Sequence, residues 1–232
     1  MSRLIWDPTG GRTYETGAKR GVLYPQSEEG TYPKGIAWNG LTGVNEAPSG
    51  AEPTAIYADD IKYLSLYSAE DFSATVTAYS SPEEFDECDG SAEIADGVTV
   101  GQQERKPFGL CYRTIIGNDT KKNNYGYKLH IIYGATAKPS AVDYKTVNES
   151  PEAIEMSWEL STTPVEVANM NATATLVIDS TKADPEKLKA LEDILYGTES
   201  TDARLPLPDE IATLMKKDAT PGASDSDLNP AG

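Results

Sequence analysis

The groups from which a catalytic or metal site could be built are 37 acidic side chains, one histidine and two cysteines. The densest carboxylate run, residues 83–89, could supply a glycosidase acid pair or calcium ligands. It lacks the spacing of an EF-hand loop. Pro82 followed by Glu83 and Glu84 is instead typical of a capped helical turn after a strand. We therefore predict a charged, solvated turn here, and rank a hydrolase with an acidic pair behind the non-enzymatic readings.

The histidine and the cysteines complete no other recognisable site. His130 lies in an alternating strand, on the side opposite Leu129 and Ile131, which predicts a sheet-face side chain rather than a catalytic base. Cys88 and Cys111 form no C-x-x-C pair, so we expect two reduced thiols in a cytosolic protein. Nucleophile-elbow and phosphate-loop motifs are absent from the sequence. The sequence therefore predicts no enzyme, no cofactor and no metal site.

The formal net charge of −17 limits the partners of the chain. A surface this acidic repels nucleic acid, whose binding requires clustered basic side chains. No 18-residue apolar run occurs, and the first residues lack the apolar stretch of a signal peptide, so we expect neither a membrane span nor secretion. The charge fits a solubilising surface, or a surface that faces DNA without gripping it.

Alternation of apolar and polar residues with period two predicts a β core over residues 61–180. Residues 72–79 follow this pattern, and Trp158 and Leu160 alternate with Glu155, Ser157 and Glu159, which gives one acidic strand face. Residues 111–116 and 127–133 predict a hairpin with a long polar tip over residues 117–126.

The regions on either side of this core differ from it. Glycine and proline divide residues 1–60 into an expected N-terminal arm and irregular segment. Asp184 as N-cap, Pro185 at the first helical position and Gly197 as a stop predict a helix in residues 184–217, with a second short helix from Pro208. Residues 218–232 have the composition of a disordered acidic tail beyond a single domain of residues 1–217.

The order of many short segments resembles the major tail proteins of long-tailed siphophages that infect Gram-positive bacteria. The resemblance covers roughly residues 4–217 and is carried by residues 14–17, 21–25, 32–41, 48–53, 57–63, 82–85, 88–90, 101–103, 105–112, 125–130, 133–135 and 162–165. These segments are not catalytic motifs, so their specificity comes from their number and order.

The resemblance implies a mainly β (β+α) tail-tube fold: two packed β-sheets in a sandwich or barrel-like arrangement, a flanking C-terminal helix, an extended N-terminal arm and a long loop. It implies hexameric rings that stack into a tube through which genomic DNA passes without specific binding. It also implies contacts with the tail terminator, the distal tail or tip protein and the tape measure protein, and a place in the virion tail after synthesis in the host cytoplasm.

Two sets of residues are candidates for roles in such a tube. The acidic strand face of Glu155, Ser157 and Glu159 is a candidate for the lumen wall. The aromatic residues of the irregular segment and the polar hairpin tip are candidates for contacts between rings: Tyr24, Tyr32, Trp38, Asn118, Lys121 and Lys122. The main alternative is a β-sandwich module that binds carbohydrate or a host receptor through an exposed aromatic platform containing Trp38.

Overall fold

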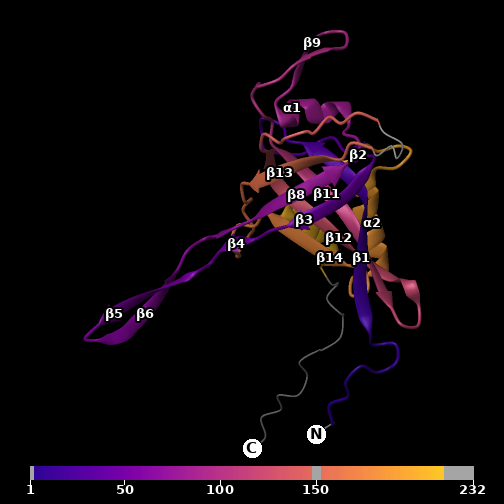
Figure 1. Cartoon of the computed structure of the whole chain (residues 1–232). Helices are drawn as coiled ribbons and strands as arrows, with labels where there is room; N and C mark the ends of the chain where they lie inside the picture. Colours follow the sequence, from indigo (N-terminus) through magenta and orange to yellow (C-terminus); the bar gives the residue numbers. More distant parts are fainter. Residues whose placement is uncertain (1–2, 148–152, 217–232) are drawn as a thin grey trace, which may run out of the picture.

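The computed structural model, which describes residues 3–147 and 153–216, is built around one curved antiparallel β-sheet of eight strands (Figure 1). A mainly β fold with C-terminal helices was predicted, and it is confirmed. The strands follow one another across the sheet in the order β2 (Ile36–Trp38), β1 (Thr13–Pro25), β11 (Phe108–Asn118), β12 (Lys122–Ala137), β13 (Met156–Thr162), β8 (Ser73–Ala78) and β3 (Leu41–Glu46), and β14 (Thr175–Asp179) branches from β12.

The branch arises because β12 changes direction at Gly134. Before this residue, Lys128–Ile132 pair with β14, and after it Ala135–Ala137 pair with β13. Gly134 has a φ of 57°, and a Cβ atom at this position would collide with the carbonyl oxygen of Thr163. The sheet therefore folds over on itself, and its two halves pack face to face. The expected sandwich is thus formed by one sheet rather than by two separate sheets.

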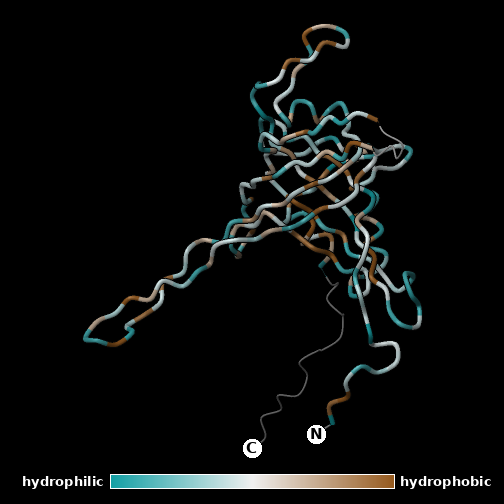
Figure 2. Tube along the Cα trace, in the orientation of Figure 1, coloured by the Kyte–Doolittle hydropathy of each residue, from teal (hydrophilic) through white to brown (hydrophobic). Residues whose placement is uncertain are grey.

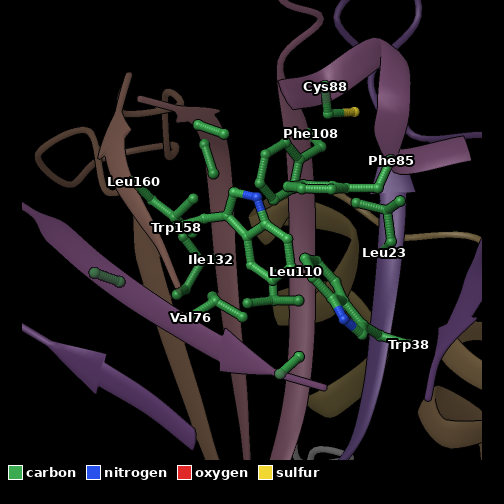
Figure 3. Packing of buried hydrophobic residues seen from close by; sticks show 14 of the residues in the cluster. Leu23, Trp38, Val76, Phe85, Cys88, Phe108, Leu110, Ile132, Trp158 and Leu160 are labelled. Atoms are coloured by element: carbon green, nitrogen blue, oxygen red, sulfur yellow. The ribbon is translucent and has the colours of Figure 1, made fainter. Parts of the chain in front are cut away.

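The space between the two halves is filled by an aromatic cluster, shown in Figure 3. Phe85 lies at its centre, with ring centroids 4.7 Å from Trp38, 5.2 Å from Trp158 and 5.5 Å from Phe108. Phe85 comes from the short helical turn η1 (Glu83–Phe85), which continues into α1 (Asp86–Asp89). The carboxylate run around it is therefore the helical turn that was predicted, with a buried phenylalanine inside it.

The opposite face of the sheet is covered by the helices α2 (Pro185–Tyr196) and α3 (Pro208–Met215). The Asp184 side chain accepts hydrogen bonds from two backbone N–H groups at the start of α2, and the helix ends at Gly197, both as predicted. Two buried tyrosines fasten this layer. Tyr24 donates to the Leu195 carbonyl at 2.6 Å, and Tyr133 donates to the Pro206 carbonyl at 2.9 Å.

Three boundaries differ from the sequence-based expectations. The β core does not begin at residue 61, because β1 is a long strand of the main sheet within the region expected to be irregular. The tip of the β11–β12 hairpin is short, because the strands continue to Asn118 and Lys122, which pair with each other. The expected tail, residues 218–232, lies outside the described residues.

Two hairpins project from the sheet instead (Figure 1). One consists of β9 (Ala92–Ala95) and β10 (Val98–Val100). The other, which we call the arm, covers residues 47–72 between β3 and β8. It contains the short strands β4 (Ser49–Gly50) and β7 (Glu70–Asp71), followed outward by β5 (Pro53–Ala58) and β6 (Ile61–Tyr67).

Replacing Phe85 with alanine should lower the free energy of unfolding by about 3–5 kcal/mol, because it leaves a cavity among the rings of the aromatic cluster. Chemical denaturation followed by tryptophan fluorescence measures the change. Tyr79→Ala is the matched control, since Tyr79 is 55% exposed and should alter stability by less than about 0.5 kcal/mol. Equal effects of the two substitutions would contradict this description of the core.

Candidate functional site

The arm carries more exposed large hydrophobic side chains than any other element of the described structure. Its strands β5 and β6 extend well beyond the main sheet, and hydrophobic residues occur along their length (Figures 1 and 2). The exposed side chains are Ile56, Tyr57, Ile61, Tyr63, Leu64, Leu66 and Tyr67, whose exposed fractions range from 39% to 71%. Exposed apolar side chains gathered on one hairpin are typical of a binding surface.

The tip of the arm is a tight acidic turn. Asp59 and Asp60 have φ angles of 51° and 61°, the left-handed backbone required by a two-residue hairpin turn. Near the base, Gly50 has a φ of 89°, and a Cβ atom there would collide with the Ala69 carbonyl oxygen. The local sequence therefore specifies a narrow two-stranded ribbon. A ribbon of this kind, without a third strand or a covering layer, is only marginally stable in water, so the arm is suited to packing against another surface.

The sequence contains the signal for this arm, although its position was not predicted. Residues 62–67 were expected to form a strand, and they do so in β6. They were assigned to the core, whereas Leu64 and Leu66 are 39% and 55% exposed. The pair of aspartates between two strand-forming runs was the available indication of a hairpin.

The residues predicted to contact neighbouring rings are not brought together. Tyr24, Tyr32 and Trp38 were predicted incorrectly, because each is at most 3% exposed and packs in the subunit's own core. Asn118 was also assigned wrongly. It is 3% exposed, and its side chain accepts a 2.5 Å hydrogen bond from the Lys121 backbone N–H, which shapes the β11–β12 turn.

Lys121 and Lys122 do lie exposed at the β11–β12 turn. Their expected contact with a partner stays a prediction. These two lysines are therefore the accessible members of the predicted inter-ring set. The main exposed apolar element is the arm, and not the segment that contains Tyr24, Tyr32 and Trp38.

The acidic strand face predicted on β13 is present. Trp158 and Leu160 point into the aromatic cluster, while Glu155 and Glu159 are exposed and Ser157 is half-buried. Glu159 forms a 2.7 Å ion pair with Lys138, and Glu155 accepts a hydrogen bond from Thr42 across the same face. This surface is polar and strand-built, as a channel wall requires, and its lumenal position stays a prediction.

The single histidine, His130, lies in a polar cluster in a groove lined by residues of β1, β3, β11 and β12. The His130 Nε2 atom is 3.3 Å from a Glu15 carboxylate oxygen on β1, and its Nδ1 atom is 3.4 Å from Glu46 on β3. The imidazole stacks on Tyr112, with ring centroids 4.8 Å apart. Among the described residues β1 and β3 do not pair as strands, so this cluster is a polar link between them.

The hydroxyl groups of the cluster serve as donors to its carboxylates. Tyr112 donates to Glu46 at 2.6 Å, and Thr114 donates to Glu15 at 2.5 Å. The neighbouring His130, supported by Tyr112, lowers the pKa of Glu46 against the opposing effect of burial. Burial raises the pKa of Glu15, but its hydrogen bonds prevail and lower it below the usual value. The arrangement is that of a structural ion and hydrogen-bond network.

Because folding lowers the pKa of Glu46, its ionised carboxylate stabilises the native state. A carboxylate whose pKa is depressed by folding stabilises the native state above its unfolded pKa, and this contribution disappears as the pH falls through the lower folded value. Glu46→Gln should therefore cost about 1–2 kcal/mol at pH 7, and the difference from the wild type should shrink below about pH 4.

Urea denaturation at pH 7 and at pH 3.5 measures this difference. The control is Glu159→Gln, because Glu159 pairs with Lys138 while 58% of its own side chain is exposed. It should change stability by at most about 1 kcal/mol at either pH. A loss for Glu46→Gln that is the same at both pH values would show that the carboxylate charge is not responsible.

Comparison with protein-family models finds no match to this chain, and comparison with curated proteins finds none either. Within residues 3–147 and 153–216, no helix has both the length and the apolar character to cross a membrane. In the same ranges, no three histidine, cysteine or acidic side chains are arranged to hold a metal ion.

Proposed function

We propose that this chain is the repeating subunit of a phage tail tube, in which stacked hexameric rings surround a channel for DNA. The observation that carries this proposal is the arm, whose aromatic and aliphatic side chains project from the body without a covering layer of their own. Apolar surface of this extent is stabilised when a partner removes it from water. The resemblance of the ordered sequence segments to major tail proteins makes a second copy of the chain the partner.

The edges of the sheet support lateral assembly into a ring. In the described part of the chain, β3 pairs only with β8 and β14 pairs only with β12, so each has one edge without a partner strand. Val177 on β14 is 48% exposed. A free edge is a template for pairing with another chain, and a closed ring removes this liability. The number of six copies comes from the resemblance.

The charge of the chain supports passage of DNA without binding. With a net charge of −17 and an acidic face of Glu155, Ser157 and Glu159, copies arranged around a channel would repel phosphates over a range of roughly 10 Å at 0.1 M salt. The proposed partners are therefore other copies of the chain and the remaining tail proteins, with DNA as a passing cargo in the virion tail.

The alternative function, binding of a carbohydrate or host receptor, has less support. It requires an exposed aromatic platform, which Trp38 and the tyrosine cluster were expected to provide. Trp38 is 3% exposed, and its indole N–H donates to the Ser80 carbonyl at 2.9 Å. The exposed tyrosines Tyr57, Tyr63 and Tyr67 lie along the narrow arm rather than on a platform of the sheet.

Electron microscopy of the purified protein tests the proposal. We expect rings or tubes for the wild-type chain at high concentration or when it is coexpressed with the other tail proteins. The triple variant Tyr57→Ser, Tyr63→Ser and Tyr67→Ser should stay folded and fail to form tubes, because these side chains are 68–71% exposed on the arm.

Tyr144→Ser is the matched control, since Tyr144 is 81% exposed but lies outside the arm, and it should assemble like the wild type. Circular dichroism and thermal unfolding verify that the triple variant retains the fold. Wild-type protein that stays a compact monomer even with the other tail proteins present would overturn the proposal. Tubes formed equally well by the triple variant would remove the arm as its support.

A further inference from the structure

A groove lies at the opposite end of the molecule from the arm, between β1, β2 and the end of α2. It has a volume of about 650 Å³, and we call it the β1–β2 groove. Its lining includes the apolar residues Ala37 and Leu41, the ring of Tyr196, and the cations Lys19 and Arg20. The groove thus combines an apolar floor with a basic rim.

The sequence opens this groove through a bulge in β1. The register with β11 shifts between Lys19 and Val22, and Arg20 has a φ of 55° in the left-handed region. The next residue is Gly21, where a Cβ atom would lie 3.1 Å from the Leu41 side chain. The bulge therefore places two exposed cations at the rim, and the glycine keeps the floor clear.

The tip of the arm is complementary to this groove in both charge and polarity. Asp59 and Asp60 form the acidic turn, and Tyr57 and Ile61, which flank it, are 68% and 66% exposed. An apolar wedge with an acidic end matches an apolar floor with a basic rim. Basic surface of this kind is scarce in this chain, which has 20 lysine and arginine residues and 37 aspartate and glutamate residues.

Three other grooves on the described surface match the arm tip less well. The groove at the His130 cluster is lined by Glu15 and Glu46, and the groove at α3 is lined by Asp209 and Glu210, so both would repel an acidic turn. The groove below the β11–β12 turn contains Arg113, but its guanidinium already lies 3.6 Å from the centre of the Tyr127 ring.

The two surfaces lie at opposite ends of one pair of strands. Leu41, the first residue of β3, lines the groove, and the arm begins directly after Glu46, the last residue of β3. Figure 1 shows the arm pointing away from the end of the sheet that carries β2. A contact between different patches at opposite ends is heterologous, so it repeats from copy to copy and forms an open series unless its rotation closes a ring.

We infer that the β1–β2 groove receives the arm tip of a second copy of this chain, with Asp59 and Asp60 facing Lys19 and Arg20. This inference rests on the proposed function and specifies the receiving surface of the stacking contact. The apolar floor supplies most of the buried area, and the charges select the orientation of the arm. In the described chain, Lys19 and Arg20 form no ion pair of their own. The Arg20 guanidinium lies 6.0 Å from the centre of the Tyr196 ring, a looser contact than the 3.6 Å between Arg113 and Tyr127, so both cations can meet the incoming acidic turn.

Reciprocal charge reversal tests the inference. The groove variant Lys19→Glu with Arg20→Glu, and the tip variant Asp59→Lys with Asp60→Lys, should each raise the concentration needed for assembly by about tenfold or more, because like charges then face each other. A chain that carries all four substitutions should assemble near the wild-type concentration. Lys182→Glu with Lys189→Glu, two cations whose side chains are 82% and 73% exposed away from both surfaces, is the matched control and should restore nothing to the tip variant.

A cross-link gives an independent readout. The double variant Ala37→Cys and Ile61→Cys should form a ladder of disulfide-linked multimers on oxidation, whereas each single variant should not. The groove assignment would be overturned if the wild type formed tubes while the four-substitution chain did not recover assembly and no ladder appeared. The tail-tube proposal would still stand in that case. Absence of any wild-type rings or tubes would overturn both.

Discussion

Strand β12 can carry partners on both halves of the fold because its backbone turns at Gly134, where a side chain would strike the Thr163 carbonyl oxygen. The bend sends β14 to one side and β13 to the other, and so creates the interior that the rings around Phe85 fill. It also sets the direction of β8 and β3, from which the arm extends. The position of the exposed surface therefore follows from the backbone freedom of one glycine.

The tyrosines of the chain fall into two groups with different physical roles. Tyr24 and Tyr133 are completely buried, and burial raises the pKa of both phenols. Their hydroxyl groups donate to backbone carbonyls and so remain satisfied in the core. Tyr57, Tyr63 and Tyr67 instead project from the arm into water. The same side chain thus fastens the helical layer to the sheet and supplies the apolar surface that we propose for assembly.

Local signals predicted local structure well, and contacts distant in sequence were harder to foresee. The limits of α2 follow from Asp184 and Gly197, which act within one helical turn. The alternation on β13 predicted its acidic face because one side packs on the core. The arm was missed because alternation in residues 62–67 has the same form whether the strand covers a core or projects from it. Trp38 was predicted to be exposed because it lies in a glycine-rich segment. The local sequence does not indicate that the rings of Phe85 and Trp158 pack against it.

The two cysteines show what burial does to the covalent chemistry of the subunit. Cys88 and Cys111 are free and buried, and desolvation raises the pKa of each thiol to about 12. Burial thus keeps both groups in the thiol form near neutral pH, whereas the thiolate is the form that reacts with oxidants and attacks disulfides. The chain can therefore pass from reducing to oxidising surroundings and keep a single covalent structure.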